Sequence, residues 1–87
     1  MVKYKLLKFE ASWCVPCKVV SFHLEKLKPK NPNVEFISID QKGNEDKFKE
    51  HGIRSVPTLV LQDPEGNTIR TMSGVMSASD IENFINK

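Results

Sequence analysis

The chain has 87 residues, of which 39% are hydrophobic and 28% charged, with a formal net charge of +2. These values are typical of one small globular domain, and the 13 basic residues are interleaved with 11 acidic ones, without a basic stripe for nucleic acid. The N-terminus has no signal-peptide pattern, and no apolar run approaches the roughly 20 residues of a membrane span. We therefore expect one cytoplasmic domain over residues 1–87, monomeric, with neither nucleic acid nor membrane as a partner.

The first half of the chain predicts two strands and two helices. Residues 4–9 are mostly apolar, which is typical of a central strand covered on both faces. Apolar residues at helical spacing predict a helix over 16–28, ended by the prolines that follow it. Residues 34–40 predict a second strand. Asn44 is expected to cap a short second helix that Gly52 closes.

The second half predicts a hairpin and a last helix. Residues 58–62 and 68–72 are strand-like and flank the turn sequence DPEGN. Ser77 and Asp80 form a capping box for a helix with an apolar inner face. The expected order is β-α-β-α-β-β-α, an α/β fold with a four-stranded mixed sheet flanked by helices. The first two strands, joined through a helix, should be parallel.

Both cysteines of the chain, Cys14 and Cys17, lie in the stretch EASWCVPCKVV. Cys14 falls at the start of the predicted helix, where free backbone N–H groups and the positive end of the helix dipole favour a thiolate. Cys17 lies one turn later and faces inward, so the two sulfurs are within bonding reach. The pattern predicts that exposed Cys14 attacks a substrate disulfide and that shielded Cys17 resolves the mixed disulfide.

Neighbouring residues support a redox role over a metal site. Lys18 adds positive charge near the thiolate, and Trp13 offers a flat apolar surface beside it. A structural zinc site needs four ligands, and only His23 and His51 remain to join the cysteines. They belong to different predicted helices, so we expect no metal and no cofactor other than a Cys14–Cys17 disulfide.

The stretch GIRSVPTLV places Pro57 directly before a predicted strand. One interpretation is a trans proline that starts the strand, since only about 5–6% of X–Pro bonds in folded proteins are cis. The other is a cis bond that turns the Val56 backbone toward the thiols. The free N–H and C=O groups of Val56 would then pair with an extended substrate.

WCVPCK followed by GIRSVPTLV resembles the thioredoxin family, as do SIDQ at 38–41 and the glycines Gly66 and Gly74. The resemblance covers nearly the entire chain and implies a thioredoxin-like fold. It implies Cys14 as the nucleophile and Cys17 as the resolving thiol. It also implies oxidised proteins and a thioredoxin reductase-type electron donor as partners. The implied substrate-docking surface consists of Trp13, Val15, Pro16, the cis-bonded Val56 and Pro57, and Gly74.

Three features depart from the family's pattern. The chain starts at the strand before the motif, without the family's usual first strand and helix, as in glutaredoxins. Val15 replaces a glycine. Lys8 stands where the family has a buried aspartate, and Phe36 where it has a partner lysine. An ammonium near the thiols favours thiolates and predicts a potential less negative than roughly −270 mV. Alternatively, Lys8 extends its ammonium into water.

Two other functions compete with a protein-disulfide reductase. A glutaredoxin-like enzyme would use glutathione, whose carboxylates Lys5, Lys8 and Lys18 would attract. Trp13 and the Val15–Pro16 pair favour the thioredoxin-like alternative. A non-catalytic binding module with the same fold would need neither the C-x-x-C nor the Val-Pro-Thr sequence, and both are intact.

Overall fold

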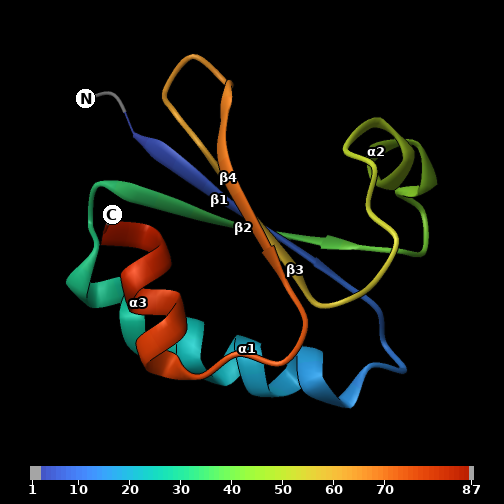
Figure 1. The fold of residues 1–87 in the computed structure, drawn as a ribbon, viewed down its shortest axis with the longest axis horizontal. Helices are drawn as coiled ribbons and strands as arrows, with labels where there is room; N and C mark the ends of the chain where they lie inside the picture. Colours follow the sequence, from blue (N-terminus) through green and yellow to red (C-terminus); the bar gives the residue numbers. More distant parts are fainter. Residues whose placement is uncertain (1–2, 87) are drawn as a thin grey trace.

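The structure, a computed structural model, describes residues 3–86 and confirms the predicted order of elements (Figure 1). Within these residues, no helix has the length and apolar character needed to cross a membrane. The elements are β1 (Tyr4–Glu10), α1 (Val15–Leu27), a 3₁₀ turn (Lys28–Lys30), β2 (Val34–Asp40), α2 (Glu45–Glu50), β3 (Thr58–Gln62), β4 (Thr68–Ser73) and α3 (Ala78–Asn86).

The four strands form one mixed sheet in the order β2-β1-β3-β4. β1 is parallel to β2, and β3 is antiparallel to both β1 and β4, as the helical crossover and the hairpin predicted. α1 and α3 lie on one side of this sheet, and α2 lies apart from them near the ends of β2 and β1 (Figure 1). β1 is therefore central, which explains why its sequence is mostly apolar.

Alternating side chains of β1 enter two separate apolar clusters. Leu6 joins the larger cluster under α1 and α3, whereas Leu7 and Phe9 join a smaller one with Phe48 of α2. The rings of Phe9 and Phe48 meet edge to face, with 5.1 Å between their centroids. The predicted inner face of α1 is confirmed, with four buried residues: Cys17, Val20, Leu24 and Leu27. This packing holds α1 against the sheet and sets the position of its N-terminus.

The predicted capping box of α3 is confirmed. The Ser77 N–H donates to Asp80 Oδ2 at 3.0 Å, and the Asp80 N–H donates to Ser77 Oγ at 3.1 Å. Hydrogen bonds from the Ser77 backbone N–H, and then from the Ser77 side chain, to the Asp80 carboxylate hold the pKa of Asp80 below its usual 3.8.

Two predicted helix boundaries differ in the structure. Asn44 precedes α2, but its side chain donates to the Asp40 carbonyl at 2.9 Å and does not cap the helix. Gly52, with a φ of +65°, follows the end of α2 as predicted. α1 ends at Leu27, one residue before the predicted boundary, because the chain tightens into a 3₁₀ turn around Pro29.

Candidate active site

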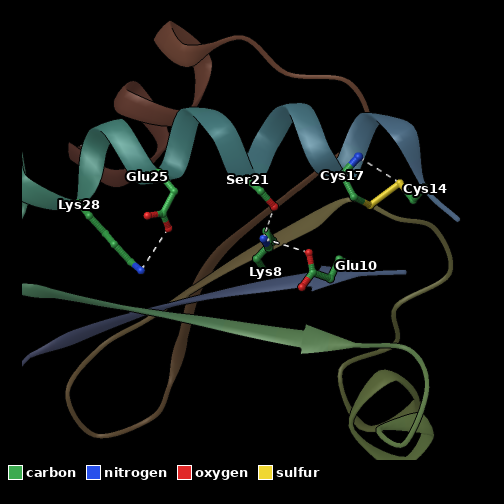
Figure 2. A network of polar contacts seen from close by, with 7 residues as sticks. All are labelled: Lys8, Glu10, Cys14, Cys17, Ser21, Glu25 and Lys28. Atoms are coloured by element: carbon green, nitrogen blue, oxygen red, sulfur yellow. Dashed lines mark hydrogen bonds and ion pairs between the residues drawn. A yellow bond between two sulfur atoms is a disulfide. The ribbon is translucent and has the colours of Figure 1, made fainter. Parts of the chain in front are cut away.

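Cys14 is the N-cap residue of α1 and is joined to Cys17 by a disulfide (Figure 2). Its backbone is extended, with φ of −91° and ψ of 104°, and the two Cα atoms lie 5.3 Å apart. The Cys17 N–H donates to Cys14 Sγ at 3.1 Å. The sulfur of Cys14 thus takes the place that a side-chain oxygen occupies in an ordinary helix cap.

Electrostatics at this helix end favour negative charge on the sulfur. Pro16 lies in the first turn of α1, and this turn, which lies within residues 3–86, carries no acidic residue. Lys18 is exposed in that turn. A thiolate of Cys14 would therefore be stabilised by the Cys17 N–H and by the positive end of the helix dipole, with no nearby carboxylate in that turn to oppose it.

The expectation that Cys14 is exposed and only Cys17 shielded is wrong for this disulfide-bonded state. Their relative exposures are 3% and 2%, and both pack with Ala11 against Val56. The reason is that the disulfide and the Cys17 N–H hold the Cys14 sulfur against the helix. In the disulfide-bonded state, a partner protein would therefore contact the exposed residues around the cysteines and not the buried sulfur atoms.

Those neighbours are apolar and exposed. Trp13 and Val15 flank Cys14 and are 70% and 67% exposed, and Pro16 is exposed as well. Val75 follows Gly74 and is 86% exposed. A hollow of about 90 Å³ beside Trp13 is lined by Gln41, Phe48, Ile53, Arg54, Ser55 and Val56.

The segment opposite the cysteines contains a cis peptide bond between Val56 and Pro57, so the cis interpretation is confirmed and the trans one is wrong. The Gly74 N–H donates to the Pro57 carbonyl at 3.0 Å, which holds Gly74 beside this bond. Among residues 3–86, the Val56 N–H and C=O have no hydrogen-bond partner. A strand-like peptide can pair with such backbone groups.

Lys8 lies beneath α1 and is only 7% exposed, so the alternative in which its ammonium extends into water is wrong (Figure 2). Its ammonium donates to Ser21 Oγ and forms an ion pair with Glu10 Oε1 at 2.9 Å. Ser21 is four residues after Cys17, on the next turn of the same helix. A charged network thus connects β1 with the helix that carries both cysteines.

The sequence reasoning missed Glu10 and Ser21. The period of two along a strand was the available signal for Glu10, since Lys8 and Glu10 point to the same face of β1. Ser21 follows Cys17 at the i, i+4 spacing of a helix face. A buried lysine needs a polar or charged partner, and this requirement together with the spacing could have indicated both residues.

The ring contacts of the two histidines are with phenylalanines and not with the cysteines. The His51 ring packs near Phe9, with 5.3 Å between centroids, and His23 lies beside Phe22. Within residues 3–86, no three His, Cys, Asp or Glu side chains gather closely enough to hold a metal ion. The two cysteines are instead joined to each other.

The sequence and the fold are both similar to known thioredoxins. The sequence model named Thioredoxin matches residues 2–87. The chain is 34% identical to a thioredoxin of Haemophilus influenzae over 83 residues, covering 94% of this chain and 77% of that protein. It is 32% identical to a Bacillus subtilis thioredoxin over 84 residues, covering 94% of this chain and 79% of the relative.

The solved structure of oxidised mitochondrial thioredoxin 3 from Saccharomyces cerevisiae superposes with a TM-score of 0.88 and 32% identity. It covers 97% of this chain, which matches 77% of the yeast chain. With its disulfide at the start of α1 and the cis proline opposite, the chain belongs to the thioredoxin family and is a protein-disulfide oxidoreductase.

Proposed function

We propose that this chain reduces disulfides of oxidised proteins and is itself reduced by a thioredoxin reductase-type electron donor. The observation that carries the proposal is the hydrogen bond from the Cys17 N–H to Cys14 Sγ, at 3.1 Å, at a helix N-terminus without acidic residues in its described first turn. This geometry supports Cys14 as the attacking thiolate. We propose Cys17, on the inner face of α1, as the resolving thiol.

The proposed cycle needs no bound cofactor because the sulfur pair carries both electrons. The Cys14 thiolate attacks one sulfur of the substrate disulfide, that S–S bond breaks, and the other substrate sulfur leaves as a thiolate. Cys17, once deprotonated, attacks Cys14 Sγ and releases the second substrate thiolate. The substrate gains two electrons and two protons, and the Cys14–Cys17 disulfide forms. The electron donor returns two electrons and two protons to the pair.

We propose that a substrate segment docks between two sides of a surface. Trp13, Val15 and Pro16 form one side, and the Val56–Pro57 bond with the adjacent Gly74 forms the other. Exposed apolar side chains supply contact area. The Val56 N–H and C=O, which have no hydrogen-bond partner among residues 3–86, supply strand-like hydrogen bonds. Both features lie beside Cys14, since Val56 packs against the cysteine cluster.

We propose Lys8 and Lys18 as tuning residues of the thiols. Lys18 lies in the first turn of α1, where its charge adds to the helix dipole. Lys8 lies beneath the helix, but its Nζ forms an ion pair with Glu10 Oε1 at 2.9 Å. Because the carboxylate offsets the ammonium, we expect the effect of Lys8 on the thiols to be smaller than an unpaired lysine would produce.

The test compares two electron-transfer systems. One assay follows reduction of the insulin disulfides with NADPH and a bacterial thioredoxin reductase, and the other follows reduction of a small glutathione mixed disulfide with glutathione and its reductase. We expect turnover in the first and little in the second. Turnover only with glutathione would support the glutaredoxin-like alternative, and silence in both would support a non-catalytic binding module.

A further inference from the structure

The outer face of α1 carries an apolar stripe that begins at Val15, in the proposed substrate-docking surface, and continues beyond it along the helix. Val19 and Phe22 follow Val15 by four and seven residues, so all three lie on one side of the helix. Their exposed fractions are 67% for Val15, 46% for Val19 and 59% for Phe22. Lys26, four residues after Phe22, holds its ammonium 4.5 Å from the Phe22 ring centroid and still leaves the ring mostly exposed. We call Val15, Val19 and Phe22 the α1 stripe.

Packing of α1 against the core does not explain why the residues of this stripe are apolar. The buried residues of α1 are Cys17, Val20, Leu24 and Leu27, on the opposite side of the helix. A single exposed apolar residue is ordinary on a protein surface, but a contiguous row marks a surface that another molecule covers. Among residues 3–86, five of the seven large exposed apolar side chains lie on this stripe or near the disulfide, the other two being Tyr4 and Ile69.

The stripe is continuous with the place where the chemistry occurs. Val15 lies between the two cysteines in the sequence and is mostly exposed, so a protein whose disulfide reaches Cys14 comes close to the first residue of the stripe. From Val15 to Phe22 the helix rises by about 10 Å. Transient redox contacts are small, so a partner that also covers the stripe would gain contact area beyond the few side chains beside Cys14.

The charges along the stripe define the partner's chemistry. Lys18 and Lys26 are exposed on α1 next to the stripe, and His23 lies on its other side. Glu25 is the acidic residue of α1, and its carboxylate pairs with Lys28 at 3.3 Å. The border of the stripe is therefore predominantly positive. It fits apolar side chains edged by carboxylates.

We propose that the α1 stripe, with Lys18 and Lys26, is a second docking surface for protein partners that present an apolar segment flanked by acidic residues. The inference rests on the proposed function, because the partner's disulfide is what brings it to Val15. A second copy of this chain fits less well. A two-fold symmetric contact would bring the predominantly positive borders of the two stripes together, and like charges repel.

The test uses three synthetic disulfide peptides with the same reactive core. One is the core alone, one adds an arm of leucine and glutamate long enough to reach Phe22, and one adds an arm of serine and lysine. For the unmodified chain we expect the acidic apolar arm to raise kcat/KM about tenfold over the core peptide. Phe22→Ser should remove this gain. Lys26→Glu should reduce the preference for the acidic arm over the basic one.

Ile69→Ser is the matched control, because Ile69 is 42% exposed on β4 and lies outside the stripe. It should keep the tenfold ratio. Equal kcat/KM for the three peptides, or an equal loss in Ile69→Ser and Phe22→Ser, would overturn the second docking surface. Failure to reduce even the core peptide would overturn the proposed function itself. A dimer in sedimentation that Phe22→Ser dissociates would assign the stripe to self-association and refute a protein partner of other sequence.

Discussion

The two ends of the sheet differ in how their polar groups are used. A hollow of about 320 Å³ lies at the end away from the cysteines. Two of its polar side chains are engaged, since Asn31 donates to the Leu27 carbonyl and Arg70 donates to that of Phe84. The hollow beside Trp13 is only about 90 Å³, yet next to it the Val56 backbone groups have no partner among residues 3–86. We therefore propose the docking site from the available hydrogen-bonding groups and not from the volume of a hollow.

Substitution of the two cysteines should have the largest effect on activity. Cys14→Ser should abolish turnover because no thiolate remains to attack a substrate. Cys17→Ser should instead accumulate mixed disulfides, since Cys14 still attacks but nothing resolves the product. Mass spectrometry of the trapped species, with oxidised insulin as substrate, measures this difference. Turnover by Cys14→Ser at the unmodified rate would refute the assigned roles.

Reactivity of the reduced chain sharpens the difference between the two sulfurs, which are equally buried in the disulfide state. Once reduced, Cys14 should react with iodoacetamide well before Cys17, and at a pH below the unperturbed thiol pKa of about 8.5. The physical reason is the N–H of Cys17 and the helix dipole, both directed at Cys14 Sγ. Peptide mapping after timed quenching gives the two rates. Identical rates would contradict the prediction.

Removing apolar contact at each end of the sheet tests where partners dock. Trp13→Ala should lower kcat/KM for oxidised insulin about tenfold, equivalent to about 1.4 kcal/mol of binding. Ile69→Ala, an exposed apolar residue on β4, is the matched control and should leave kcat/KM within about twofold of the unmodified chain. If the two variants lose equal activity, docking is not confined to the cysteine end.

The Lys8–Glu10 pair gives an effect on both stability and redox chemistry. Glu10→Leu should cost about 1–3 kcal/mol of unfolding free energy, because among residues 3–86 it leaves the buried Lys8 ammonium with Ser21 as its one polar partner. Lys8→Met should cost less, since the Glu10 side chain is 23% exposed and reaches water. Urea unfolding of the reduced forms measures both.

Lys8→Met should also raise the pKa of the cysteine thiols and make the potential more negative, because it removes a positive charge beneath α1. Equilibration with glutathione buffers gives the potential, and thiolate absorbance gives the pKa. The double variant, which adds Glu10→Leu, is the control for the offsetting carboxylate. If neither property changes in Lys8→Met, Lys8 has only a structural role.

The smallest expected effect is at the capping box of α3. Ser77→Ala should cost about 1 kcal/mol and leave kcat/KM for insulin unaltered. The pKa of Asp80 is lowered in the folded chain, so its stabilising contribution is present above the unfolded value of 3.8 and is lost as the pH falls through the folded pKa. Asp80→Asn should therefore flatten the stability profile in that acidic range. A steep profile in both variants would assign the acid sensitivity to other groups.

Local pattern in the sequence determined the elements, the position of Cys14 at a helix start and the capping box of α3. These features depend on residues within one or two turns of each other, so their spacing is enough to predict them. The resemblance of WCVPCK and GIRSVPTLV to the thioredoxin family added the pairing of two segments far apart in the chain.

Only the tertiary structure decided the remaining features, because each depends on contacts between distant segments. The cis conformation of the Val56–Pro57 bond was one of two open interpretations. Lys8 became a buried ion-pair partner because α1 covers that face of β1 and brings Ser21 to it. The α1 stripe has the same helical spacing as a buried face, and periodicity alone could not tell them apart. The stripe is exposed because the sheet and α3 pack against the opposite side of α1, where the buried residues of that helix lie.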